Sequence, residues 1–427
     1  MKMRSVVESR ERLRGLYEVE REMIRTLTTW IYRVGEPEQK YMLCQHVWES
    51  AQHAKFLRIR GEELGNFGRG MSARGILQHL FEAGVQLAGA DEAIGLYYGV
   101  LKPMLKEAYA SYLKKTEPLA DWPTRQLLES FLEDAERQEA EWVERFGEVR
   151  VGGQTKEIQQ WLKDQGGLFG ILEMSPETLP EWGNLLPGSY RHPRQCNRGD
   201  YPICASAFGD DPGENTVIGE WIEDPATDAR IIRIMIYIWL LNEMDAVDYL
   251  ATIFYDTPGM PEDFHYDAAR HLWDESRHSQ FGFRQLPRMG FDLGQIEQQV
   301  ELYEILVQMN PAERYAMMTM QFEAGSFGIK ATVMERVREL NDFEADTLLA
   351  FDRNDEQNHV RYGHRWIQPL LEEFGHKGDV EAFLKQTNEK FNGIHAEVSA
   401  QLSHTLEAAQ RLTANDVRER ILAPTAN

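Results

Sequence analysis

Six Glu and His side chains in the C-terminal half of the chain have the types and the spacing of metal ligands. In chain order they are Glu243, Glu275, His278, Glu323, Glu356 and His359. Two glutamates stand alone, and the other four residues form two Glu-x-x-His pairs. One Glu from each of two helices and a Glu-x-x-His pair from each of two others make a carboxylate-bridged two-metal site inside a four-helix bundle. The expected chemistry is therefore that of two neighbouring metal ions.

The Glu-x-x-His pattern occurs four times in the chain, so its context must select the pairs that bind metal. The pair ending at His265 follows Pro261 at an expected helix start, and the pair ending at His376 runs past a glycine at an expected helix end. The pairs that end at His278 and His359 fall inside predicted helices, where residues i and i+3 share a face. These two pairs are the predicted ligands.

An aspartate, Asp274 or Asp355, comes directly before the Glu of each predicted pair. A ligating His usually donates its second ring N–H to a carboxylate, which fixes the tautomer of the ring. We therefore expect Asp355 to orient His278 and Asp274 to orient His359, across the bundle.

The intervals between the ligands suit a helical bundle. Glu243 and Glu275 are 32 residues apart, and Glu323 and Glu356 are 33 apart, which fits neighbouring antiparallel helices joined by a turn. The interval of 48 residues between Glu275 and Glu323 fits a longer crossover. In this half, helices are predicted near 227–256, 261–287, 294–340 and 343–374, with a tail helix over 379–412.

The N-terminal half repeats this pattern. Residues 46–56 align with residues 271–281 at a constant offset of 225, which also places Glu18 on the first ligand. The run Phe-Glu-Ala-Gly occurs both at 81–84 and at 322–325. Such internal repeats indicate that one structural unit occurs twice. In this half, helices are predicted near 5–34, 37–65, 72–115 and 122–146.

The N-terminal copy lacks a complete ligand set. Ser50 takes the place of the Glu on the second helix, and Glu139 takes the place of the His on the fourth. The residues that remain as candidates are Glu18, His53, Glu82, Glu136 and Glu139. Two interpretations stay open, namely a structural pseudo-site and a surviving mononuclear or alternative-metal site.

The segment from about Thr227 to Gly375 resembles the ferritin-like di-iron carboxylate superfamily, in its oxygen-activating branch. The resemblance rests on the six ligands and on residues 274–278, Asp-Glu-Ser-Arg-His, which are similar to the Asp-Glu-x-Arg-His segment of bacterial multicomponent monooxygenases. It implies two iron ions, with manganese or a mixed pair as the other options. It also implies that Glu275 and Glu356 are the bridging, catalytic carboxylates, and that the protein is a homodimer.

Two positions depart from members of that superfamily. Gly282, four residues after His278, stands where the ribonucleotide reductase small subunit carries its radical tyrosine. Phe327, one turn after Glu323, stands where the bacterial monooxygenases carry a threonine. A radical-storing subunit is therefore not expected, and the methane monooxygenase mechanism does not transfer directly.

The predicted activity is that of a di-iron oxygenase or oxidase, which activates O2 to oxidise a small organic substrate. The sequence does not separate hydroxylation, N-oxygenation and desaturation. Because no dinucleotide-binding fingerprint is present, electrons are expected from a separate reductase or from the substrate itself. The alternatives are a ferroxidase or other iron-handling protein, and a metal-free structural bundle.

Two glycines and several aromatic residues accompany the ligands. Gly325 and Gly328 follow Glu323 inside a predicted helix, where Gly costs up to about 1 kcal/mol relative to Ala. A channel for substrate or O2 beside Glu323 and close packing of helices are the two interpretations. The flanking aromatic residues, most of which we expect in the core, are Trp239, Trp273, Phe281, Phe322, Phe327 and Phe351.

The composition is that of a large helical protein without a nucleic-acid or membrane partner. A net charge of −23 disfavours binding to nucleic acid and to anionic membranes. The chain has no apolar run of 18 residues, and its N-terminus has no apolar signal region. Three cysteines without metal-binding spacing suit reduced thiols, so a cytoplasmic location is expected.

The predicted fold class is all-α, with two tandem ferritin-like four-helix bundles. The N-terminal bundle covers 1–146, an irregular Gly/Pro-rich segment covers 147–226, the C-terminal bundle covers 227–375, and a C-terminal helix and tail cover 376–427. Aromatic residues in the irregular segment favour packing between the bundles over a substrate lid. They are Trp161, Phe169, Trp182, Tyr190, Tyr201, Phe208 and Trp221.

Overall fold

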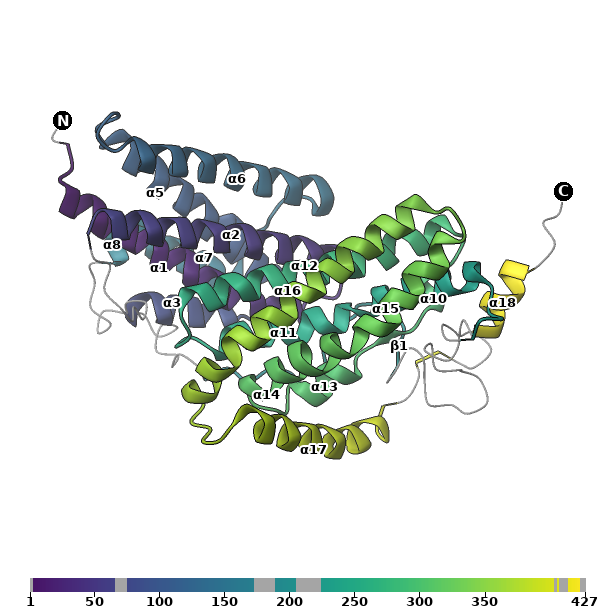
Figure 1. The fold of residues 1–427 in the computed structure, drawn as a ribbon. Coiled ribbons are helices and arrows are strands. Elements are labelled where there is room, and N and C mark those ends of the chain that lie inside the picture. The colour runs from purple at the N-terminus through teal and green to yellow at the C-terminus, as the bar shows by residue number, and fades with distance from the viewer. Residues whose placement is uncertain are drawn as a thin grey trace. The chain divides into compact units, whose positions relative to one another are not determined.

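The chain folds almost entirely into helices (Figure 1). In the described part of the chain the only strands are β1 (Ile203–Cys204) and β2 (Gln298–Gln299), which pair in parallel. The all-α prediction is therefore confirmed. The computed structural model describes residues 3–65, 75–172, 189–204, 224–402, 405–406 and 414–422.

Contacts divide the chain into two compact units, each built from several segments. The first unit comprises Met1–Arg33, Met42–His192 and Phe254–Ala269. The second unit comprises Val34–Tyr41, Pro193–Ile253 and Arg270–Asn427. Each unit therefore includes chain from both predicted bundles.

The first unit contains most of the helices of the N-terminal half. The helix α1 begins with a capping box, in which Ser5 and Glu8 satisfy each other's backbone N–H groups. It packs against α3, and α5 packs against α6. A π-helix over Tyr97–Leu101 leads directly into α5. The helices are α1 (Val6–Ile31), α2 (Pro37–Glu63), α3 (Gly75–Val85), α4 (Ala90–Leu96), α5 (Lys102–Lys114) and α6 (Trp122–Phe146).

The segment 147–226, which was predicted to be irregular, contains two helices in its described residues. They are α7 (Gly153–Asp164) and α8 (Gly167–Ile171). Ile158 and Leu162, one turn apart, are fully buried, so a short apolar stripe explains α7. Of the aromatic residues predicted to pack in this segment, Trp182, Phe208 and Trp221 lie outside the described residues.

The second unit is assembled around α10, whose apolar residues recur at helical spacing. Ile231, Ile234, Ile238 and Leu241 are buried in one core that also contains residues of α12, α15 and α16. The helix α15 packs against both α10 and α16 (Figure 1). The helices are α10 (Ala229–Asn242), α11 (Met244–Asp256), α12 (Glu262–Arg288), α13 (Glu301–Leu306), α14 (Pro311–Ala316), α15 (Glu323–Arg338), α16 (Phe343–Glu373), α17 (Val380–Ser399) and α18 (Ala414–Leu422).

The long helix predicted over 294–340 is broken into several pieces. After a 3-10 turn and α13, a new helix starts at Pro311, because Asn310 and Glu313 form a capping box there. A π-helix over Met317–Phe322 then joins α14 to α15. The prediction missed the Asn-Pro helix start, which lies between two apolar stretches.

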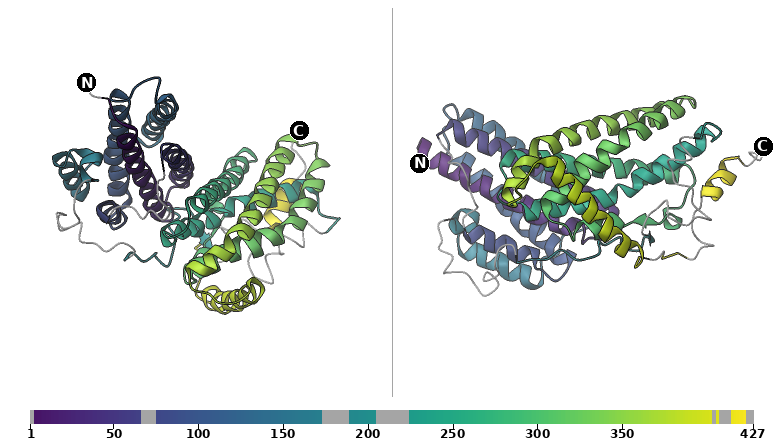
Figure 2. Two further views of the ribbon diagram at one scale, coloured as in Figure 1. Left: turned by 60° about the vertical axis from the view of Figure 1, so that its left-hand side comes forward. Right: turned by 60° about the horizontal axis from the view of Figure 1, so that its bottom comes forward.

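Two other predicted helices have different ends. The helix predicted over 227–256 is interrupted at Glu243, which caps α10 before α11 begins. The tail helix predicted over 379–412 is α17, which ends at Ser399 and packs against α13 and α14 (Figure 2). Within the described residues, no helix combines the length and the apolar character needed to cross a membrane.

Candidate metal centre

All six predicted ligands come together in the second unit, where they form two overlapping groups. Within each group the potential ligand atoms lie no more than 4.8 Å from one another. Glu275 belongs to both groups, so its carboxylate is placed to bridge two ions. Group A consists of His271, Glu275, Glu323 and His359, and group B consists of Glu243, Glu275, His278 and Glu356.

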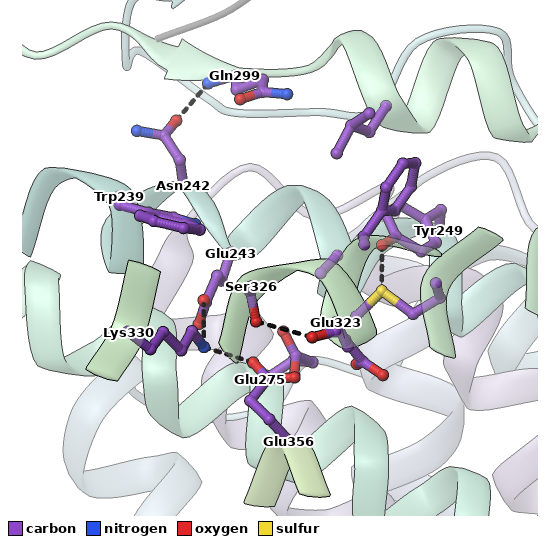
Figure 3. A pocket seen from close by; sticks show the side chains of 14 residues that line it. Trp239, Asn242, Glu243, Tyr249, Glu275, Gln299, Glu323, Ser326, Lys330 and Glu356 are labelled. Carbon is purple, nitrogen blue, oxygen red and sulfur yellow. Dashed lines mark hydrogen bonds and ion pairs between the residues drawn. The ribbon is translucent and has the colours of Figure 1, made fainter. Parts of the chain in front are cut away.

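Four helical elements supply the ligands, and Figure 3 shows their four glutamates. Glu243 stands at the break between α10 and α11, and Glu323 is the first residue of α15. The helices α12 and α16 each supply a Glu-x-x-His pair from one face. Because a π-helix precedes α15, the phase of that helix is shifted just before Glu323.

Two glycines allow these helices to approach closely. A Cβ at Gly282 of α12 would lie 2.2 Å from the carbonyl oxygen of Tyr237 in α10. A Cβ at Gly363 of α16 would lie 2.3 Å from Oγ1 of Thr319 in the π-helix. No side chain fits at Gly282, which explains why this position cannot carry a tyrosine.

Each predicted ligand has one buried side-chain atom without a hydrogen-bond partner among the described residues. Leaving a buried polar atom unsatisfied costs about 1–3 kcal/mol, and more when the group is charged. Metal ions would satisfy all of these atoms at once, so the donor set fits two ions. The atoms are Glu243 Oε2, Glu275 Oε1, His278 Nδ1, Glu323 Oε2, Glu356 Oε2 and His359 Nδ1.

The two aspartates lie against the outer nitrogens of the ligand histidines. Asp355 Oδ2 lies 3.4 Å from Nε2 of His278, and Asp274 Oδ2 lies 3.4 Å from Nε2 of His359. With Nε2 directed at a carboxylate, Nδ1 of each ring is left to bind metal. This is the pairing that the sequence predicts.

Arginines neutralise these aspartates. Arg270 Nε donates to Asp274 at 2.7 Å, and Arg277 donates to Asp355 at 2.6 Å. Burial raises the pKa of Asp274, but hydrogen bonds from His359 and Arg270 outweigh it and hold that pKa well below its usual range. Both aspartates therefore remain anionic orienting groups.

Sequence reasoning missed three buried residues of the centre. His271 Nε2 lies 2.6 Å from Glu323 Oε1, and its ring stacks on His359 with centroids 3.8 Å apart. Lys330 donates to Asp352 at 2.7 Å. A signal was present for two of them, since His271 is four residues before Glu275 and Asp352 is four before Glu356, on the same helix faces.

Lys330 is an unusual neighbour for metal ligands. Its Nζ lies 2.5 Å from Glu356 and 3.5 Å from Glu243 (Figure 3). Burial raises the pKa of Glu243 to about 7. Burial also raises the pKa of Glu356, but the Lys330 ammonium outweighs it and brings that pKa down to about 2. The ammonium thus compensates part of the negative charge of group B.

A cavity of about 180 Å³ adjoins the ligands (Figure 3). Its walls beyond the carboxylates are mostly apolar or aromatic, and Lys330 is its basic residue. Two of the predicted flanking aromatics, Trp239 and Phe322, line it, whereas Phe351 is 60% exposed and does not. Besides ligands and Lys330, the cavity is lined by Trp239, Asn242, Ala246, Tyr249, Gln299, Leu302, Met318, Phe322 and Ser326.

Gly325 and Gly328 of α15 were interpreted either as lining a channel beside Glu323 or as allowing close packing of helices, and the structure supports neither. A Cβ added at Gly325 or Gly328 would have no atom of the described residues within 4 Å, so close helix packing is wrong. Both positions are exposed and neither lines the cavity beside Glu323. The open space at these glycines is on the outside of the helix.

The five candidates of the N-terminal copy do not assemble into a site. Glu18 pairs with Arg14 at 3.1 Å, Glu82 accepts from Tyr255 at 2.5 Å, and Glu139 pairs with Lys106 at 2.5 Å. Glu136 is exposed. Among the described residues, groups A and B are the only clusters of His, Cys, Asp and Glu with metal-binding geometry, so the first unit has none.

His53 instead repeats two of the contacts of His278. Its Nδ1 lies 3.1 Å from Glu20 and its Nε2 lies 3.1 Å from Asp134, as His278 lies between Glu243 and Asp355. The counterpart of Glu243 is therefore Glu20 rather than Glu18.

The buried Lys102 is the counterpart of Glu323. It directly follows the π-helix of the first unit, as Glu323 follows that of the second, and it contacts Gln138. Ala135 and Gln138, one and four residues after Asp134, then correspond to the second Glu-x-x-His pair. With an ammonium and two uncharged side chains at ligand positions, this cluster cannot hold two metal ions.

Comparison with known protein families gives a match over part of the chain. The model of a family described as "Protein of unknown function (DUF455)" matches residues 228–421, a segment that includes all six predicted ligands. Neither the curated proteins nor the solved structures contain a match to the chain.

Proposed function

We propose that this protein is a non-haem di-iron oxygenase or oxidase that uses O2 to oxidise a small organic substrate. One observation carries the proposal: the predicted ligands form two groups that share Glu275 and lie beside a cavity of about 180 Å³. The unsatisfied buried atom of each predicted ligand supports it. The resemblance to the oxygen-activating branch of the ferritin-like superfamily supports the same reading.

The donor set suits iron, manganese or a mixed pair, because carboxylates and imidazoles bind these metals, and the resemblance to the di-iron superfamily points to iron. Two iron ions held by groups A and B would supply electrons to O2 jointly. Glu275 and Glu356 are the proposed bridging carboxylates. Glu275 belongs to both groups, and Glu356 lies 3.7 Å from His359 of group A although it belongs to group B.

The remaining side chains orient the ligands and exclude water. Asp274 and Asp355 hold the ligand imidazoles in one tautomer, which keeps both Nδ1 atoms available. Leu302, Met318 and Phe322 contribute apolar surface to the cavity that the carboxylates also line. The substrate that fits best is small and largely apolar. Its electrons, or those of a separate reductase, complete the reduction of O2.

The mostly apolar cavity beside the ligands favours turnover of an organic compound over iron storage. In a storage protein the centre passes ions onward, so no apolar pocket is required beside it. Ferroxidase activity is the second candidate function. The number of iron ions taken up per chain distinguishes it from oxidation of an organic substrate.

We also propose that the chain arose by duplication of a ferritin-like bundle, with the metal site lost from the first copy. The matched contacts of His53 and His278, and the matched π-helices before Lys102 and Glu323, support this. The buried Lys102 would replace a metal ion as the positive charge inside the first copy.

Oxygen consumption by the iron-loaded protein tests the proposed activity. Protein reconstituted anaerobically with Fe(II) is mixed with O2 and with sets of small apolar alcohols, amines and aromatic compounds. We expect O2 uptake that rises with a substrate and yields an oxidised product, and neither in a Glu275→Ala variant. Uptake of many irons per chain without any product would favour iron handling instead.

A further inference from the structure

Lys330 makes the two metal-binding groups unequal. Its ammonium lies 2.5 Å from Glu356 and 3.5 Å from Glu243, and both carboxylates belong to group B. In the described part of the chain, no Lys or Arg side chain pairs with the group A carboxylates, Glu275 and Glu323, whose close partners are histidines. Group B thus contains a lysine ammonium that group A lacks.

A divalent ion in group B would compete with this ammonium for the same oxygen atoms. Two positive charges a few ångströms apart repel each other strongly in a buried site, where water screens little. Lys330 is 2% exposed, so its charge is not dispersed into solvent. Filling group B therefore requires the ammonium to withdraw from Glu243 and Glu356.

The structure provides both a place and a partner for the withdrawn ammonium. Lys330 lines the cavity of about 180 Å³, so its flexible four-carbon stem has space on that side (Figure 3). Asp352 lies 2.7 Å from Nζ and belongs to neither group, so this ion pair can persist. Two divalent ions and one ammonium would then balance the carboxylates of Glu243, Glu275, Glu323, Asp352 and Glu356.

We propose that the Lys330 ammonium holds the place of the second metal ion, so that group A fills first and group B fills only when this ammonium withdraws toward Asp352 and the cavity. This inference rests on the proposed metal centre. It assigns Lys330 a positioning role in assembly of the centre, without contact with substrate.

Titration of the metal-free, full-length protein with Co(II), followed by calorimetry and visible absorption, tests the order. For the natural protein we expect two steps of one ion each, the second at least about tenfold weaker. The variant Lys330→Met should tighten the second step by at least about tenfold and bring the two steps together. The control Lys390→Met, which removes a half-exposed ion pair with Glu313, should leave both steps unchanged.

Variants of the carboxylates assign the steps to the groups. Glu323→Gln, in group A alone, should weaken the first step, and Glu243→Gln, in group B alone, should weaken the second. These two variants and the natural protein decide the order even if Lys330→Met does not fold.

Three results would overturn the inference. They are equal binding of both ions by the natural protein, an unchanged ratio of the two steps in Lys330→Met, and a Glu323→Gln variant that loses only the second step. Absence of any Co(II) binding by the natural protein would instead contradict the proposed metal centre, so the two failures are distinct.

Discussion

At the scale of single residues, the centre combines ligands that each have one buried atom without a hydrogen-bond partner with aspartates that contact both a ligand His and an Arg. Asp355 contacts His278 on one side and Arg277 on the other. Its carboxylate therefore sets the orientation of a ligand ring without belonging to group A or group B. Loss of such an orienting group typically costs 10–100-fold in metal affinity.

We therefore expect Asp355→Ala to weaken metal binding by about 10–100-fold while the protein stays folded. Competition with a chelator of known affinity measures the change. Asp346 lies on the same helix as Asp355 and makes a surface ion pair with Arg338. Asp346→Ala is therefore the matched control and should bind metal normally. Equal affinities of the two variants would show that Asp355 does not orient His278.

A second prediction at this scale concerns the pH dependence of stability. Burial lowers the pKa of His53, but hydrogen bonds to Asp134 and Glu20 outweigh it and raise the pKa above its usual value. A raised pKa in the folded state stabilises the fold fully below the unfolded pKa of about 6.5, and this contribution is lost as the pH rises through the folded pKa.

His53→Gln should therefore lose more stability near pH 6 than near pH 10, relative to the natural protein. Urea denaturation at both pH values gives the two differences in the free energy of unfolding. His79 is another histidine of the first unit, and the variant His79→Gln is the control for a general effect of replacing a histidine. A difference that is the same at both pH values would mean that His53 is neutral in the folded protein.

The six predicted ligands were accessible to sequence reasoning because spacing along a helix fixes which side chains share a face. Lys330 was not, because lysine is not a metal ligand and nothing local shows that it turns inward among carboxylates. The N-terminal candidates went wrong for another reason. The constant offset of 225 assumes equal loop lengths, and it placed Glu18 where the structure has Glu20. The repeated Phe-Glu-Ala-Gly run assumes equal helix phase, and it placed Glu82 where the structure has Lys102.

At the scale of helices, two features outside the reach of local patterns position the centre. The π-helix over Met317–Phe322 changes the phase of the third ligand helix just before Glu323. Close contact between α10 and α12 depends on Gly282, whose added Cβ would meet the backbone of Tyr237 and Leu241. Backbone atoms in packed helices cannot move aside as a flexible side chain can.

We therefore expect Gly282→Ala to destabilise the protein by about 1–3 kcal/mol, because α10 and α12 must separate to admit the methyl group. Gly325→Ala is the matched control. Its Cβ meets open space, so the better helix propensity of Ala should stabilise the helix by up to about 1 kcal/mol. Chemical denaturation compares the two variants, and a stabilising Gly282→Ala would contradict the close approach of α10 and α12.

At the scale of the whole molecule, the all-α class followed from composition and from helical spacing, whereas the extent of the units did not. The contacts place Phe254–Ala269 in the first unit and Val34–Tyr41 in the second, across the boundaries predicted at 146 and 227. Long-range pairs such as Lys40 with Asp248, 2.8 Å apart and fully buried, define these units, and no local pattern reports them.

The central claim is that groups A and B hold two metal ions, and metal content tests it most directly. Iron and manganese are counted per chain after anaerobic reconstitution, in the natural protein, in Glu275→Ala and in Glu136→Ala, which alters an exposed glutamate of the first unit. We expect about two ions per chain in the natural protein and in Glu136→Ala, and a loss of both in Glu275→Ala. A natural protein without stoichiometric metal, or a Glu275→Ala variant that keeps both ions, would contradict the claim.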